Sequence, residues 1–444
     1  MSKTITPELL NAWSGAYERS PERRLAALAL SKGELMQAAF SQEEANRMHQ
    51  RFSLEVKTMD VANQEASGRC WLFAATNVLR EAIGRELNIA GFELSQSYLA
   101  FWDKFERCNY FLEVMLDTWE LPEDDRTVSF VLHTGVHDGG QWDMFANIVR
   151  KYGIVPKDAY DETWQTSHSG QMNHVLNQAL KAAAARLRRA LRAGAGREEA
   201  EKEKEKVLGS IYAFLCSCYG RPPVSFDFEY YDADKVYHAE RGLTPLAFAE
   251  KYALGLLDST VSVIHAPTKD KPFHRTYTIR LLGNVVGGRP VKHLNLTMEE
   301  LKAAAIRQLQ AGKVVWFGSD VGHYGERKLG LWDDRSFDLP LLTGLDLAIS
   351  KEDALDYGVA AMNHAMCLTG VNLTPDGRPT RWKIENSWGD KNGEKGYYIC
   401  SDSWFDAFVF QAAIEREYLG DLAALSEQEP AELEPWDPMG TLAD

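Results

Sequence analysis

The feature that most constrains the fold is a change in hydrophobic pattern near residue 258. Before that point, apolar residues recur at helical spacing, as they do over residues 69–87. After it, short apolar runs bounded by Gly and Pro are typical of strands. A chain that passes from mostly helix to mostly sheet is expected to be an α+β protein, because it lacks a strand–helix–strand repeat. The predicted strands include residues 261–264, 276–279, 314–317, 365–368, 382–384 and 396–399.

Local signals place the helices of the first half. Thr6, followed by Pro, is a typical N-cap, and Ser41 opens a capping-box pattern. Residues 174–215 carry apolar positions at helical spacing and predict two helices, interrupted near residues 194–196.

Charge argues against nucleic acid as a partner. The 444 residues include 49 basic and 64 acidic side chains, a net charge of −15, and such a chain repels phosphate backbones. The locally basic stretch from Lys181 to Arg197 is the support for a nucleic-acid role, and the acidic residues that follow it offset its charge.

The sequence predicts a cytoplasmic protein without membrane contact. Its start lacks the basic-then-apolar pattern of a signal peptide, and no stretch approaches the ~20 apolar residues of a membrane span. Six irregularly spaced cysteines fit a reducing compartment. Cys216 and Cys218 lack a second ligand pair, so neither a metal site nor a cofactor is expected.

Cys70 differs from the other cysteines because it stands where a loop enters the apolar helix of residues 69–87. A thiol at a helix N-terminus meets unsatisfied backbone N–H groups and the positive end of the helix dipole. Both favour the thiolate, which is the reactive form, and the neighbouring Arg69 adds positive charge.

A base and its orienting group follow later in the chain. His364 stands at the entrance to an apolar strand, from which it can project into a cleft. The amide oxygen of Asn386 can accept from one imidazole nitrogen and orient the ring. Trp388 can shield that bond from water and so strengthen it.

These residues lie in three blocks that resemble the signature blocks of papain-like cysteine peptidases: Gly68-Arg-Cys-Trp71, Asn363-His-Ala365 and Asn386-Ser-Trp-Gly389. The block Asp138-Gly-Gly-Gln-Trp-Asp143 and the ending from Pro435 resemble the bleomycin hydrolase and bacterial aminopeptidase C branch, over essentially the whole chain.

The resemblance implies a two-lobed papain-like core with large helical insertions and a C-terminal arm. The interval from Cys70 to His364 exceeds the papain-type spacing by about 150 residues, which the insertions would supply. The expected segments are 1–60, an N-terminal helical extension; 61–170, the helical catalytic lobe; 171–257, a mainly helical insertion; 258–424, the β-rich lobe with His and Asn; and 425–444, the arm.

The resemblance also implies roles. Cys70 would be the nucleophile, His364 the acid–base group and Asn386 its orienting partner. Gln64 would form the oxyanion hole with the backbone N–H of Cys70.

Four further residues are implied in substrate binding. Gly139 and Gly140 would bind the main chain of an extended substrate, with a plain turn as the alternative. The arm would place its terminal carboxylate on the substrate's α-ammonium. This chain continues past Ala443 to Asp444, where the family usually closes on Ala, so Asp444 is either trimmed, or alters the register, or is a remnant of expression.

The sequence therefore predicts a cytoplasmic cysteine aminopeptidase that acts on peptides and assembles, as its relatives do, into a homohexamer. The alternatives are an endopeptidase or altered-register peptidase because of Asp444, a thiol acyltransferase with the same triad, and a nucleic-acid-binding or scaffold protein with the same fold.

Overall fold

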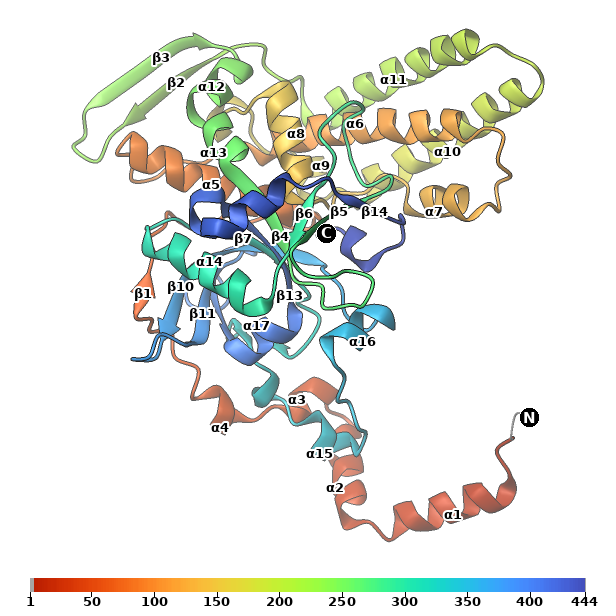
Figure 1. Ribbon diagram of the computed structural model, residues 1–444, viewed down its shortest axis with the longest axis vertical. Coiled ribbons are helices and arrows are strands. Elements are labelled where there is room, and N and C mark those ends of the chain that lie inside the picture. Colours follow the sequence, from red (N-terminus) through yellow and green to blue (C-terminus); the bar gives the residue numbers. More distant parts are fainter. Residues whose placement is uncertain (1–3, 444) are drawn as a thin grey trace.

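The computed structural model describes residues 4–443, and a twelve-stranded mixed sheet forms its centre (Figure 1). The strands run in the order β14-β5-β6-β4-β13-β7-β10-β11-β12-β9-β8, with β1 also paired to β10. The predicted α+β class is therefore observed. The strands are β1 (Leu54–Glu55), β4 (Thr260–Ile264), β5 (Arg275–Ile279), β6 (His293–Asn295), β7 (Val315–Ser319), β8 (Gly325–Glu326), β9 (Leu331–Trp332), β10 (His364–Leu373), β11 (Pro379–Glu385), β12 (Tyr397–Ser401), β13 (Val409–Glu415) and β14 (Ala431–Leu433).

Strand β10 lies in the interior of this sheet and begins at His364. It pairs antiparallel with β7, where His364 faces Ser319, and with β11, where Cys367 faces Glu385. Its first eight residues are buried, which accounts for the continuous apolar run in the sequence.

A long buried helix, α5 (Cys70–Glu86), packs against the sheet. The indole N–H of Trp316 in β7 donates to the carbonyl of Trp71 at 3.2 Å, and the Cys367 thiol of β10 donates to the carbonyl of Ala74 at 3.1 Å. The start of α5 is thereby held against the strand that begins at His364. The other helices of more than six residues in the body are α6 (Gln96–Asp117), α7 (Arg126–Thr134), α8 (Trp142–Tyr152), α12 (Pro245–Tyr252), α14 (Met298–Gln310) and α17 (Asp402–Phe408).

The insertion contains the two expected helices, α10 (Gly170–Arg192) and α11 (Arg197–Tyr219), which form a projecting hairpin (Figure 1). It also contains an isolated two-stranded sheet, β2 (Phe226–Tyr231) and β3 (Tyr237–Leu243), which the sequence pattern did not predict. Phe228 of β2 packs on Phe248 at 5.0 Å between ring centroids, so this hairpin is fixed by a contact with α12.

The N-terminal segment extends away from the body (Figure 1). It contains α1 (Pro7–Glu18) and α2 (Pro21–Leu30), and Thr6 caps α1 as predicted, accepting from the backbone N–H of Leu9 at 3.4 Å. Neither helix has a buried residue. The shorter α3 (Leu35–Ala39), α4 (Gln42–Ala45) and α15 (Leu339–Thr343) connect it to the body, and Ser41 caps α4.

The tail is extended over most of its length, with two short 3₁₀ turns that its sequence did not indicate. Residues Gly420–Glu427 form the first turn and Pro438–Gly440 the second. Between them β14 pairs parallel with β5. Across residues 4–443, no helix combines the length and the apolar character required to cross a membrane.

Candidate active site

Cys70 is the first residue of α5 and is fully buried. Arg69 stands at the N-cap position without a side-chain cap, and its carbonyl accepts from the backbone N–H groups of Leu72 and Phe73 at 2.9 and 3.0 Å. The Arg69 guanidinium makes two hydrogen bonds to Glu162, at 3.0 and 2.9 Å. Its charge is therefore largely balanced within that pair, while Cys70 lies at the positive end of the α5 dipole.

His364 is held by Asn386. The imidazole Nε2 lies 2.9 Å from Asn386 Oδ1, and the backbone N–H of Ser387 donates to the same oxygen at 2.8 Å. An amide oxygen only accepts hydrogen bonds, so Nε2 carries a proton in this contact. Nδ1 is then the nitrogen left to exchange a proton with a nucleophile.

Aromatic and charged groups surround this pair. The Trp388 ring lies 4.8 Å from the His364 ring between centroids, and Asn386 is buried. Burial lowers the pKa of His364 to about 4; the hydrogen bond to Asn386 opposes the shift, and the charge of Arg327 adds to it. The guanidinium of Arg327 stacks over Trp388 at 4.7 Å. Burial therefore favours the neutral imidazole, and Asn386 offsets part of this effect.

Hydrogen bonds join the loop that precedes Cys70 to the loop that carries Asn386. The backbone N–H of Gln64 donates to the carbonyl of Ser387 at 2.8 Å, and the Ser387 hydroxyl donates to Gln64 Oε1 at 2.6 Å. Gln64 Nε2 donates to the carbonyl of Ser67 at 2.6 Å. The structure thus gathers Gln64, Asn386 and His364 at the loop that leads into Cys70.

Asp138 fixes the other side of that loop. Its buried carboxylate accepts from the backbone N–H of Gly68 at 3.1 Å, from Lys104 Nζ at 2.7 Å and from Asn173 Nδ2 at 2.8 Å. Burial opposes ionisation, but Lys104 and these hydrogen bonds hold the pKa of Asp138 well below its usual range. The Asp138 carbonyl accepts from the indole N–H of Trp71 at 2.6 Å. The segment that follows is therefore anchored beside Cys70.

The C-terminal arm ends on that segment. The Gly140 N–H donates to the Ala443 carbonyl at 3.0 Å, and the Ala443 N–H donates to the Gly140 carbonyl at 3.2 Å, an antiparallel bridge. A Cβ on Gly140 would lie 2.5 Å from the Trp71 ring, so only glycine allows this approach. The Gly139 carbonyl accepts from Arg107 Nη2 at 2.5 Å. Asp444 lies outside the described residues.

The backbone groups of Gly140 that the resemblance assigns to substrate are thus occupied by the arm, and Ala443 is fully buried. Two polar contacts fix the arm before this point. Gln141 Nε2 donates to the carbonyls of Met439 and Thr441 at 3.1 and 2.7 Å, and the buried Lys271 pairs with Asp437 at 2.8 Å. The arm therefore stands where an extended peptide was expected.

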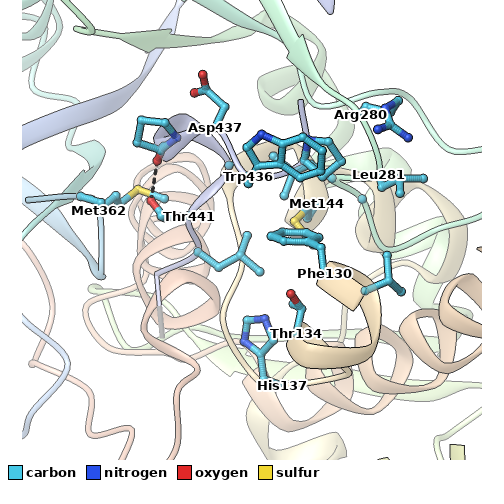
Figure 2. A pocket seen from close by; sticks show the side chains of 18 of the residues that line it. Phe130, Thr134, His137, Met144, Arg280, Leu281, Met362, Trp436, Asp437 and Thr441 are labelled. Carbon is cyan, nitrogen blue, oxygen red and sulfur yellow. Dashed lines mark hydrogen bonds between the residues drawn. The ribbon is translucent and has the colours of Figure 1, made fainter. Parts of the chain in front are cut away.

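A cavity of about 660 Å³ lies against the arm. Figure 2 shows Trp436 of the arm and Phe130 of α7 on one side of it, and Met362 and Thr441 on the other. Asn363, the residue before His364, also lines the cavity. Its wall is largely apolar, so it can hold apolar side chains next to the site.

Several residues that shape the site were not assigned a role from the sequence. Ser387 lies inside the third signature block, and Asp138 and Gln141 lie inside the block of residues 138–143, so the motifs contained them. Their partners Gln64, Gly68 and Thr441 are remote in sequence, and only the tertiary structure pairs them.

Comparisons with known proteins agree with this architecture. Residues 4–440 match the model of the peptidase C1-like family. Aminopeptidase C of Lactobacillus delbrueckii subsp. lactis is 44% identical over 447 residues, covering 100% of this chain and 99% of that protein. Aminopeptidase C of Listeria monocytogenes is 42% identical, covering 100% of both chains. The crystal structure of PepW from Lactobacillus rhamnosis superimposes with a TM-score of 0.96 at 46% identity, covering 100% of both chains.

Proposed function

The chain belongs to the peptidase C1-like family, and from that premise we propose that it is a cysteine aminopeptidase that releases N-terminal residues from peptides. The predicted family and papain-like fold class are confirmed by the full-length matches. Relatives that align over their whole length are named Aminopeptidase C, which supports the activity. The observation that carries the proposal on this chain is the Gly140–Ala443 bridge beside Cys70.

In the proposed mechanism Cys70 transfers its proton to His364, and the thiolate attacks the carbonyl carbon of the first peptide bond. The imidazolium then protonates the departing amine as the C–N bond breaks, leaving a thioester. Water, giving its proton to His364, attacks the thioester and releases the amino acid. Asn386 keeps Nδ1 turned to the reaction, and its hydrogen bond to Nε2 favours the imidazolium that forms when Cys70 transfers its proton.

We assign the oxyanion hole to Gln64 and the backbone N–H of Cys70. Ser67 holds one Nε2 hydrogen of Gln64, which leaves the second for the developing oxyanion. Such a donor typically contributes about 3–4 kcal/mol to stabilisation of the transition state. Trp388 covers the His364–Asn386 bond and would keep water from it.

The arm limits cleavage to the N-terminal end. It occupies Gly140 and therefore excludes a longer peptide from that side, and its terminal carboxylate would bind the substrate's α-ammonium. Deleting residues 439–444 is expected to reduce aminopeptidase activity and to release endopeptidase activity. An unchanged ratio of the two activities would refute this role.

The C-terminus also tests how the arm is bound. Ala443 is paired as a substrate backbone would be, so self-trimming predicts that purified wild-type enzyme lacks Asp444 and that the C70A variant retains it. The mass of the C-terminal peptide, measured in both proteins, shows whether Asp444 has been removed. Retention in both proteins would favour an altered register, the basis of the endopeptidase alternative.

The direct test of the activity is hydrolysis of aminoacyl arylamides. The C70A variant is expected to be inactive, while C216A, which removes a half-buried thiol from α11, should retain wild-type activity. Activity that survives C70A would overturn the proposal. Transfer products formed beside hydrolysis would indicate the acyltransferase alternative.

We propose in addition that the chain forms a homohexamer through its N-terminal helices. Several apolar side chains on α1 and α2 are exposed: Leu9, Leu10, Trp13, Tyr17, Leu25 and Leu28. The Arg23 guanidinium fixes α2 to α15 by donating to the carbonyl of Leu342 at 3.1 Å. Replacing Leu25 and Leu28 by Glu should reduce the mass measured by light scattering; a monomeric wild type would contradict the proposal.

A cytoplasmic location and peptide substrates complete the proposal. Buried thiols such as Cys108, Cys367 and Cys400 fit a reducing compartment. The basic stretch from Lys181 to Arg197, the support for nucleic-acid binding, makes several contacts within the protein. Arg188 and Arg192 donate to backbone carbonyls after α6, and Arg197 forms an ion pair with Glu113. Cell fractionation tests the location, and salt-dependent retention on DNA would revive the binding alternative.

A further inference from the structure

A buried charge cluster connects the nucleophile helix to the strand that leads to Asn386. Glu385 is the last residue of β11, is 1% exposed, and directly precedes Asn386. Its Oε1 accepts from Arg80 Nη2 and from Asn77 Nδ2, both at 2.8 Å. Arg80 and Asn77 are buried residues of α5. The cluster therefore spans the contact between α5 and the sheet.

We propose that Glu385 is a positioning residue, whose carboxylate fixes the end of β11 against α5 and so sets the place of Asn386 and His364 relative to Cys70. This inference rests on the proposed function. Asn77 stands seven positions after Cys70, about 10 Å along the helix axis, so the cluster acts through the backbone and does not touch the reacting atoms.

The register of the sheet supports this role. Cys367 of β10 faces Glu385 of β11, and the Cys367 thiol donates to the carbonyl of Ala74 in α5. His364 lies three residues before Cys367 on the same strand. Strand β10, which begins at His364, and strand β11, which leads to Asn386, are thus both fixed to the part of α5 that follows Cys70.

The chain offers a matched control within the same cluster. Arg80 also approaches Glu81 Oε1 at 3.2 Å, and that oxygen accepts from the backbone N–H of Met59 at 2.9 Å. Glu81 belongs to α5 itself, so its contact with Arg80 does not fix β11. Removing the Glu81 charge changes the electrostatics of the cluster and leaves the link between α5 and Glu385 in place.

The ionisation of Glu385 predicts a pH dependence of kcat that a purely structural role would not produce. Burial raises the pKa of Glu385 to about 7, against the opposing effect of Arg80. Below that pH the carboxyl is protonated and the charged link is lost, so the wild type comes to resemble E385Q in acid. The other groups that face Glu385 are Glu81 on α5, Thr58, Cys367 on β10 and Tyr397 on β12.

The experiment compares kcat and KM of wild type, E385Q and E81Q on an aminoacyl arylamide between pH 5 and 8.5. For E385Q we expect kcat to fall at least about tenfold at pH 8 with KM within about twofold, the pattern of a displaced catalytic group. The loss should shrink as the pH falls below 7. For E81Q we expect a loss of less than about threefold with no such convergence.

Equal losses in E385Q and E81Q, or a loss in E385Q that does not change with pH, would overturn the proposal. If E385Q does not fold, N77A takes its place, since it removes one donor to Glu385 without leaving a charge unpaired; an unchanged kcat in N77A would then refute it. An inactive wild type would instead reject the proposed function, so the two failures are distinguishable.

Discussion

The oxygen and the nitrogen of the Gln64 side-chain amide make different contacts. Its oxygen accepts from Ser387, which fixes the loop that carries Asn386, and its nitrogen donates one hydrogen to Ser67, which leaves the second for the proposed oxyanion contact. Under the proposed function, Gln64 therefore both joins the two loops of the site and supplies an oxyanion donor. Substitutions that separate the two purposes can measure each of them.

Q64E and Q64A make that separation. Q64E keeps an oxygen for Ser387 but removes the N–H donor, whereas Q64A removes both. Both are expected to lower kcat by about 10²–10³-fold with a small change in KM, because the lost contact forms in the transition state. Both variants should also lower the thermal midpoint measured by calorimetry, because both lose the hydrogen bond to the Ser67 carbonyl and Q64E places a carboxylate oxygen against that carbonyl. Q64A alone also loses the contact with Ser387. Full activity in Q64E would contradict the oxyanion role.

The sequence predicted Gln64, His364 and Asn386, which the structure brings together at the loop before Cys70, because each lies in or beside a short motif of recognisable chemistry. It did not reveal what holds them. Asp138 and Glu385 stand beside motif residues, but their charges matter through Lys104 and Arg80, which no spacing rule connects to them. Buried ion pairs of this kind are set by tertiary contacts, so the sequence pattern alone could not pair them.

At the scale of elements, local signals predicted the helices well and the sheet only in part. The caps at Thr6 and Ser41 and the apolar period before residue 87 act within a few residues and marked real helix ends. The hairpin of β2 and β3 was missed although β2 alternates apolar and charged residues from Phe226 to Glu229, because it lies in a segment that was expected to be mainly helical. The strand order, in which β13 lies between β4 and β7, depends on contacts between residues at least 90 positions apart in the sequence.

The arm gives a prediction at this scale. Gln141 caps no helix with its side chain; instead its amide holds the carbonyls of Met439 and Thr441. Q141A should loosen the arm without touching Cys70, so the ratio of endopeptidase to aminopeptidase activity should rise several-fold while thiol titration stays stoichiometric. Q428A, which removes a contact of the tail to the carbonyl of His274 far from Gly140, is the control. An unchanged ratio in Q141A would show that β14 and Asp437 suffice to hold the arm.

At the scale of the whole molecule, the sheet buries three imidazoles. Burial lowers the pKa values of His265, His293 and His364 to about 4, whereas an unfolded histidine titrates near 6.5. Between these values each of these histidines binds more protons in the unfolded chain than in the folded one, so their contribution lowers the free energy of unfolding as the pH drops from about 6.5 to about 4. Two buried carboxyls act in the opposite sense, because burial raises the pKa of Glu385 to about 7 and that of Asp143 to about 6.

His293 isolates one of these contributions because it lies outside the active site. It is fully buried, and its Nδ1 lies 2.8 Å from the Ser262 hydroxyl. In H293Q the slope of the unfolding free energy against pH should be shallower between pH 6.5 and 4, by up to about 1.4 kcal/mol per pH unit. Urea unfolding at fixed protein concentration measures it, with the exposed His49 replaced in H49Q as the control. An identical slope in H293Q and wild type would mean that the protein takes up this proton without unfolding, and that acid sensitivity arises elsewhere in the fold.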